Sequence, residues 1–168
     1  NTVIDALHKI LVKPYNIKLA VELKENRRLI LVTVHRRENF GKPFEEIMLA
    51  LCHLVERNPD VEIIYPVHPN PEVQEPAFRI LKGVDRIYLL EPLDYLLFVN
   101  LMKNSYLILT DSGGVQEEAP ALGKPVLVLR NETERPEAVE AGSVRVIGTD
   151  KETIISETEN LLHDKSAY

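Results

Sequence analysis

Short apolar runs alternate with apolar positions at helical spacing along most of the 168-residue chain. Six runs rich in Val, Ile and Leu, each bounded by polar or turn-forming residues, predict buried strands at residues 29–34, 61–67, 86–90, 106–110, 125–129 and 144–147. Apolar residues three or four positions apart predict helices between them at residues 3–11, 44–56, 72–81, 94–103, 114–122, 136–141 and 151–163.

This alternation predicts an α/β fold. The run at residues 29–34 is apolar on both of its faces, which is typical of a central parallel strand. Repeated strand–helix units imply a Rossmann-like parallel sheet of about six strands with helices on both faces. Because no linker interrupts the pattern, we expect one domain over residues 1–168. The chain starts without Met and inside a helical pattern, so we expect it to be a fragment of a longer protein.

The loops that follow the strands hold most of the unusual residues. Ligands of such folds bind beyond the carboxyl ends of the strands, so these loops meet at one edge of the sheet. They are residues 35–41, 68–71, 91–95, 111–114 and 130–135. This clustering predicts a binding site at that edge.

Residues 111–118, which read Asp-Ser-Gly-Gly-Val-Gln-Glu-Glu, give the strongest local signal. Gly113 and Gly114 lack Cβ atoms, so a phosphate can approach the backbone at the start of a helix. Ser112 adds a hydroxyl donor, and Glu118, one turn later, can accept hydrogen bonds from ribose hydroxyls. The alternative is a tight turn with Ser112 or Asp111 as a plain helix cap. The segment matches neither a P-loop nor the Gly-x-Gly-x-x-Gly pattern of dinucleotide-binding domains.

Basic residues follow two of the strands. His35, Arg36 and Arg37 form a cationic cluster that can neutralise a diphosphate and protonate a leaving phosphate oxygen. Arg135, which precedes Pro136, can bind a phosphate as a planar fork. The alternatives are a surface ion-pair group that includes Glu38, and a solvated charged loop around Arg135.

Two further residues, His68 and Phe98, are candidates for the same edge. His68 lies between prolines in a rigid loop and can face a ligand, although a capping or packing role is the simpler interpretation. A flat base can rest between the backbone of residues 91–95 and Phe98, and the alternative for Phe98 is a plain core position.

Composition narrows the class of protein. The formal net charge of −6 argues against nucleic-acid binding, which usually requires a basic face. The single cysteine, Cys52, excludes an internal disulfide and is expected to be a buried, inert thiol in a reducing cytoplasm. No apolar run is long enough to span a membrane, and no His or Cys spacing indicates a metal site.

Together these motifs resemble the non-hydrolysing UDP-N-acetylglucosamine (UDP-GlcNAc) 2-epimerases. The matching segments are residues 33–39, 66–71, 91–95, 110–120 and 134–137, in the family's order and spacing. The resemblance runs over nearly the whole chain and implies the C-terminal half of a two-domain glycosyltransferase-B fold. It implies no cofactor, an active site between the two halves, and a homodimer for the full-length protein.

The family reaction interconverts UDP-GlcNAc and UDP-N-acetylmannosamine (UDP-ManNAc). UDP is eliminated to leave a 2-acetamidoglucal and is then added back with inverted C2. The resemblance implies a role for each candidate: His35 beside the leaving diphosphate, Ser112, Gly113, Gly114 and Arg135 around the phosphates, Glu118 on the ribose, Leu93 and Phe98 around the uracil, and Arg36 and His68 at a second UDP-GlcNAc site for an activator.

The family's carboxylates that remove the C2 proton lie in the half that this chain lacks. We therefore expect the chain to bind UDP and UDP-GlcNAc without epimerising. Two other functions fit the same residues: the nucleotide-binding domain of a glycosyltransferase-B sugar transferase, and a non-catalytic nucleotide-sugar binding module.

Overall fold

The computed structural model describes residues 27–131 and 144–163. Its strands are β1 (Arg28–Thr33), β2 (Val61–Pro66), β3 (Ile87–Leu90), β4 (Leu107–Thr110), β5 (Val126–Val128) and β6 (Val144–Val146). Its helices are the 3-10 turn η1 (Arg37–Asn39), α2 (Lys42–Arg57), α3 (Pro71–Leu81), α4 (Tyr95–Asn104), α5 (Gly113–Ala121) and α7 (Lys151–His163). The helices predicted over residues 3–11 and 136–141 lie outside the described residues.

All six strands form one parallel sheet in the order β3-β2-β1-β4-β5-β6. The chain builds outward from β1 to β3, then crosses back to place β4 on the other side of β1. The strands on either side of this reversal send their following loops in opposite directions, which opens a crevice at their carboxyl ends. Thr33 and Thr110, the last residues of β1 and β4, are partners in register there.

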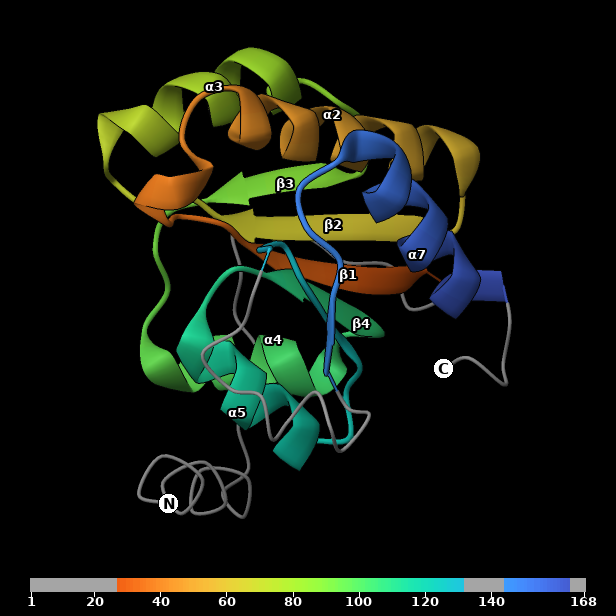
Figure 1. The fold of residues 1–168 in the computed structure, drawn as a ribbon. Coiled ribbons are helices and arrows are strands. Elements are labelled where there is room, and N and C mark those ends of the chain that lie inside the picture. Colours follow the sequence, from red (N-terminus) through yellow and green to blue (C-terminus); the bar gives the residue numbers. More distant parts are fainter. Residues whose placement is uncertain (1–26, 132–143, 164–168) are drawn as a thin grey trace.

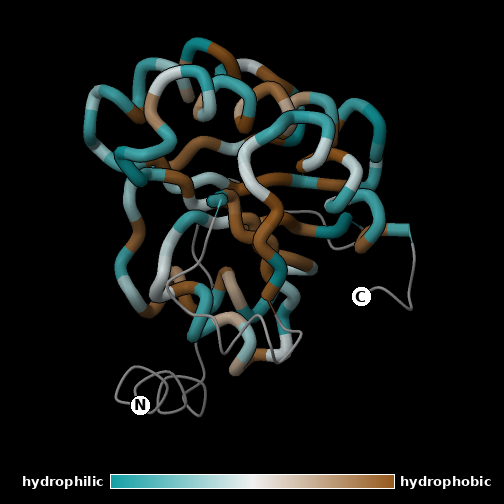
Figure 2. The backbone as a smooth tube through the Cα atoms, in the orientation of Figure 1, coloured by the Kyte–Doolittle hydropathy of each residue, from teal (hydrophilic) through white to brown (hydrophobic). Residues whose placement is uncertain are grey.

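Helices cover both faces of the sheet, as Figure 1 shows. Helices α2, α3 and α7 lie on one face, and α4 and α5 lie on the other. Alternate residues of β1 enter the two cores: Ile30 and Val32 face the first group of helices, and Leu29 and Leu31 face the second. The apolar tube segments of Figure 2 follow the strands between these layers. The predicted α/β architecture with helices on both faces is confirmed.

Helix ends follow the predicted chemistry. The Asp94 carboxylate caps α4 by accepting a hydrogen bond from the backbone N–H of Leu97 at 2.8 Å. Gly123 follows α5 with φ of +73°, a backbone conformation that glycine adopts without strain. Cys52 differs from expectation because it is half-buried rather than buried; burial still raises the pKa of its thiol.

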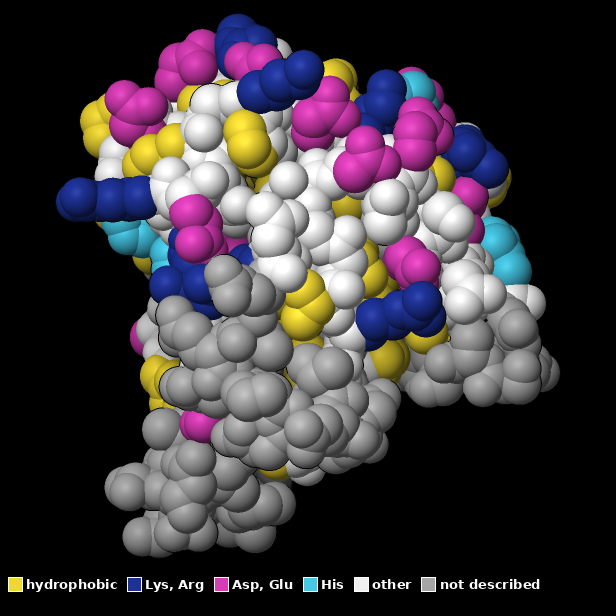
Figure 3. Space-filling model, viewed as in Figure 1, with side chains coloured by type: hydrophobic (Ala, Val, Ile, Leu, Met, Phe, Trp, Pro, Cys, Tyr) yellow, Lys and Arg dark blue, Asp and Glu magenta, His cyan; other side chains and the backbone are white. Residues whose placement is uncertain are grey.

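The surface in view mixes charges of both signs. Figure 3 shows acidic and basic side chains side by side over α2 and α3, where Arg79 forms ion pairs with Glu45 and Glu75, both at 2.7 Å. Among residues 27–131 and 144–163, no helix has the length and hydrophobicity needed to cross a bilayer. The same residues contain no group of three or more His, Cys, Asp or Glu side chains that would hold a metal ion.

Candidate functional site

A cavity of about 480 Å³ opens at the carboxyl edge of the sheet. The loops or helix starts after β1, β2, β3 and β4 all contribute to its wall. Seven residues that the sequence singles out line it: His35, His68, Leu93, Phe98, Ser112, Gly114 and Glu118. Residues up to 83 positions apart in the chain are thus brought into one site, as the clustering of the loops predicts.

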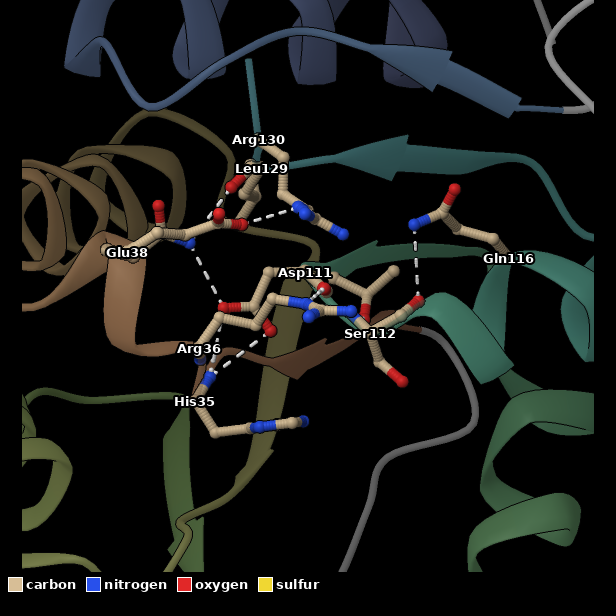
Figure 4. A network of polar contacts seen from close by, with 10 residues as sticks. His35, Arg36, Glu38, Asp111, Ser112, Gln116, Leu129 and Arg130 are labelled. Atoms are coloured by element: carbon tan, nitrogen blue, oxygen red, sulfur yellow. Dashed lines mark hydrogen bonds and ion pairs between the residues drawn. The ribbon is translucent and has the colours of Figure 1, made fainter. Parts of the chain in front are cut away.

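The buried carboxylate of Asp111 fixes the geometry of this edge. Asp111 has no exposed surface. Its carboxylate accepts hydrogen bonds from the backbone N–H groups of His35, at 3.1 and 3.2 Å, and of Arg36, at 2.9 Å. It also accepts one from Nδ2 of Asn39 at 3.0 Å. Figure 4 shows the backbone of His35 and Arg36 beside the Asp111 side chain. Asp111 therefore holds the loop after β1 instead of capping α5, so the alternative of a plain Asp111 cap is wrong.

Backbone atoms extend the same network. Nε of Arg36 donates to the carbonyl oxygen of Asp111 at 2.9 Å, and Nδ2 of Asn39 donates to the carbonyl oxygen of Leu129 at 3.1 Å. The loops after β1, β4 and β5 are thereby tied together. The loop after β5 is also held by an ion pair at 2.6 Å between Glu38 and Arg130, whose side chain is almost completely buried.

The residue before α5, Ser112, lines the cavity, and its hydroxyl does not cap the helix. Ser112 occupies the cap position, but its side chain makes no capping hydrogen bond, which contradicts the alternative of a plain Ser112 cap. Its backbone N–H donates to Oγ1 of Thr110 at 2.9 Å. A Cβ atom on Gly114 would lie 3.7 Å from Oε1 of Glu118 and 3.9 Å from Oγ of Ser112. The space above Gly114 is therefore bordered by a carboxylate and a hydroxyl, beside N–H groups that a helix start leaves without intrahelical partners.

Two histidines form the opposite wall. The rings of His35 and His68 stack with centroids 5.7 Å apart and planes inclined by 24°. Nδ1 of His68 accepts a hydrogen bond from the backbone N–H of Asn70 at 3.1 Å, which places the proton of the neutral ring on Nε2. His68 is not the helix cap, because Asn70 caps α3; it accepts a hydrogen bond from the cap residue and lines the cavity.

An apolar and a carboxylate surface complete the cavity. Leu93 and Phe98 are half-buried and pack against the core between the sheet and α4 and α5. Phe98 therefore serves both of its alternative roles, as core and as cavity wall. Burial raises the pKa of Glu118, a hydrogen bond from Tyr95 opposes this rise, and the charge of Glu117 adds to it. Sequence reasoning missed Tyr95, although it directly follows the helix-capping Asp94.

Two of the predicted residues that the structure describes, Gly113 and Arg36, are not part of the cavity wall. Gly113 is buried as the first residue of α5, and Arg36 is turned toward the Asp111 carbonyl. Arg135 lies outside the described residues.

The sequence of the chain matches proteins of known family. The UDP-N-acetylglucosamine 2-epimerase family profile matches residues 1–168. A UDP-N-acetylglucosamine 2-epimerase from Salmonella typhimurium is 54% identical in sequence to this chain. The alignment covers 100% of this chain and 47% of that protein. The chain spans about half the length of the curated relatives it matches.

Solved structures of 2-epimerases have a fold similar to that of this chain. The UDP-GlcNAc 2-epimerase of Neisseria meningitidis, solved with UDP-GlcNAc bound, superposes with a TM-score of 0.92 at 43% identity, over 100% of this chain and 47% of that one. The enzyme of Methanocaldococcus jannaschii, solved in complex with UDP-GlcNAc and UDP, gives a TM-score of 0.82 at 37% identity, over 98% and 47%.

The hydrogen bonds of Asp111 predict that replacing its carboxylate by an amide strongly lowers the stability of the fold. In Asp111→Asn, the new amide N–H₂ competes with the three donor groups that now face the carboxylate. We expect the free energy of unfolding in urea to fall by about 2–3 kcal/mol. The matched control is Asp60→Asn: Asp60 is half-exposed and pairs with Arg28 at 2.6 Å, so its loss is expected to cost less than about 1 kcal/mol. Equal effects of the two substitutions would contradict the role given to Asp111.

Proposed function

The chain belongs to the UDP-N-acetylglucosamine 2-epimerase family, and from this premise we propose that it is the UDP-binding half of an enzyme interconverting UDP-GlcNAc and UDP-ManNAc. Residues 1–168 would form a single nucleotide-binding domain. One observation carries the proposal: a single cavity combines phosphate-binding, hydroxyl-binding and apolar surfaces. Family membership favours this function over the sugar transferase and over the non-catalytic module.

The diphosphate is assigned to the start of α5. The Ser112 hydroxyl is a hydrogen-bond donor, and the open space above Gly114 gives room for a phosphate. Gly113, which has no Cβ atom, lets a phosphate approach the backbone closely. The helix dipole adds positive potential at this end. His35 faces the same cavity and is proposed to protonate the phosphate oxygen of the leaving UDP. By its place in the sequence, Arg135 is proposed as a further phosphate contact.

The nucleoside is assigned to the other end of the cavity. Leu93 and Phe98 give the half-buried apolar surface that a uracil ring needs. Glu118, whose Oε1 borders the cavity near Gly114, is proposed to accept hydrogen bonds from the ribose hydroxyls. The acceptor-only carboxylate and the donor hydroxyls are chemically matched.

The proposed reaction begins with loss of UDP and of the C2 proton, which leaves a 2-acetamidoglucal. Readdition of UDP with the proton returned to the opposite face inverts C2. Removal of this proton requires a base held close to the sugar. Glu118 is the only carboxylate in the described cavity wall, and it is assigned to the ribose. We propose that the base for this proton is supplied by the other half of a full-length enzyme, as the family resemblance implies.

A second UDP-GlcNAc site near Arg36 and His68 remains a prediction. His68 stacks on His35, which is assigned to the leaving diphosphate, so such a site would border the substrate site. The Arg36 guanidinium instead contacts the Asp111 carbonyl, so its part in such a site would require this contact to change. A homodimer of the full-length protein is likewise a prediction.

The assignment of the diphosphate is tested by Gly114→Ala. The added methyl group meets Glu118 and Ser112 at ordinary contact distances, so the fold is expected to tolerate it while the phosphate space is filled. Calorimetric titration with UDP should show affinity reduced by about 1–3 kcal/mol, roughly 5- to 150-fold. Gly123→Ala, at the far end of α5, is the matched control: it strains a positive-φ position but should leave affinity unchanged. UDP binding unaffected by Gly114→Ala would contradict the assignment.

The division of labour between the two halves is tested by activity. The purified 168-residue chain is incubated with UDP-GlcNAc, and the products are separated to detect UDP-ManNAc. We expect none, because the one carboxylate in the described cavity wall is assigned to the ribose and His35 to the leaving phosphate. The Salmonella relative, which is about twice as long, is assayed in parallel to show that the assay detects turnover. UDP-ManNAc formed by the chain alone would refute the proposed division.

A further inference from the structure

The peptide group between Val34 and His35 is held at both of its ends by buried side chains. Its carbonyl oxygen, on Val34, accepts a hydrogen bond from the hydroxyl of Tyr65 at 2.7 Å. Its N–H group, on His35, donates to the carboxylate of Asp111 at 3.1 and 3.2 Å. Strand β1 and its register with β4 end just before this peptide group, at Thr33. The two side chains therefore orient the peptide group at the point where the strand has ended.

Tyr65 reaches the Val34 carbonyl from the neighbouring strand β2. Its side chain has no exposed surface and packs in the core between the sheet and α2, α3 and α7, so the close packing fixes the position of its ring. Burial raises the pKa of its hydroxyl, and the negative charge of Asp111 raises it further, so the hydroxyl stays protonated and remains a donor. Tyr65 does not line the cavity, so any effect it has on a ligand there must pass through another residue.

The peptide group on the other side of the His35 Cα atom is also held, because the N–H group of Arg36 donates to the Asp111 carboxylate at 2.9 Å. With the peptide groups before and after it both restrained, the φ and ψ angles of His35 are fixed, and so is the direction of its Cα–Cβ bond. The remaining freedom of the imidazole ring is limited by His68, on which it stacks with centroids 5.7 Å apart. The place of this ring in the cavity therefore depends on the orientation of the Val34–His35 peptide group.

We propose that Tyr65 is a positioning residue for His35: its hydroxyl sets the orientation of the Val34–His35 peptide group and thereby directs the imidazole toward the diphosphate of the ligand. The inference rests on the proposed function, in which His35 contacts the leaving diphosphate. Hydrogen bonds and proton transfer depend steeply on distance and angle, so a small rotation of this peptide group alters the contact with the phosphate. Tyr65 itself touches neither the ligand nor the reacting atoms.

The test is a double-mutant cycle on the affinity for UDP, measured by calorimetric titration of the 168-residue chain. Tyr65→Phe keeps the ring and removes only the hydroxyl, and it is combined with His35→Ala. We expect Tyr65→Phe to raise the Kd for UDP about three- to ten-fold when His35 is present, the scale of a weakened hydrogen bond to a charged group. In the His35→Ala background, the same substitution should change the Kd less than about two-fold, because the residue through which Tyr65 acts is gone.

Tyr106→Phe is the matched control. It also removes a tyrosine hydroxyl that bonds a backbone carbonyl, that of Leu161 at 3.5 Å, but it does so away from the cavity wall. We expect it to leave the Kd for UDP unchanged in both backgrounds. Circular dichroism establishes that each variant is folded at the temperature of the titration.

Two results of this cycle would overturn the inference while the proposed function stands. Equal weakening of UDP binding by Tyr65→Phe in both backgrounds would mean that the hydroxyl only satisfies a buried carbonyl and supports the fold. No weakening in either background would mean that the position of His35 does not depend on the hydroxyl.

A measurement on the chain without UDP separates the inference from the proposed function. At constant pH, we expect Tyr65→Phe to shift the NMR signals of the His35 ring protons, because the His35 ring moves relative to the ring of His68. Tyr106→Phe should leave these signals in place. If the wild-type chain does not bind UDP, the proposed function fails; a shift of the His35 signals then still supports the positioning role of Tyr65, and unchanged signals overturn it.

Discussion

A carboxylate without exposed surface, that of Asp111, holds the site together. Burying a charge in this way is costly unless donors surround it, and here two backbone amides and the Asn39 side chain do so. The donors belong to the loop after β1, whereas Asp111 itself leads into α5. One interaction therefore fixes the position of His35 relative to the helix start. The chemistry proposed for the site depends on that relation, because proton transfer to a phosphate oxygen requires both groups on the same ligand.

The sheet topology explains why the loop after β1 and the start of α5 meet at this edge. Strands β1 and β4 are neighbours in the sheet, although their last residues in register, Thr33 and Thr110, lie 77 positions apart in the chain. The hydroxyl groups of these two residues lie 2.6 Å apart at the carboxyl edge. The loops that follow are therefore forced together at the reversal of strand order. Tyr65 reinforces the same edge from β2, because its buried hydroxyl donates to the carbonyl oxygen of Val34 at 2.7 Å.

Much of this arrangement could be predicted from the sequence, because hydrophobic periodicity reports which faces are buried and parallel strands gather their following loops at one edge. The five loops and seven cavity residues follow from that rule. The partners of Asp111 do not, since they lie 72 to 76 positions away and no local pattern encodes them. For the same reason the sequence suggested Asp111 or Ser112 as a helix cap, and missed both the stacked histidines and Tyr95.

The central claim is that the loop after β1 and the start of α5 bind the diphosphate as one unit. Amide hydrogen exchange of the chain, measured with and without UDP, tests it directly. The account predicts that UDP slows exchange at His35 and Arg36 together with the first amides of α5. Slowing at the α5 amides alone, or only around the separate groove lined by Lys42 and Asp150, would contradict it.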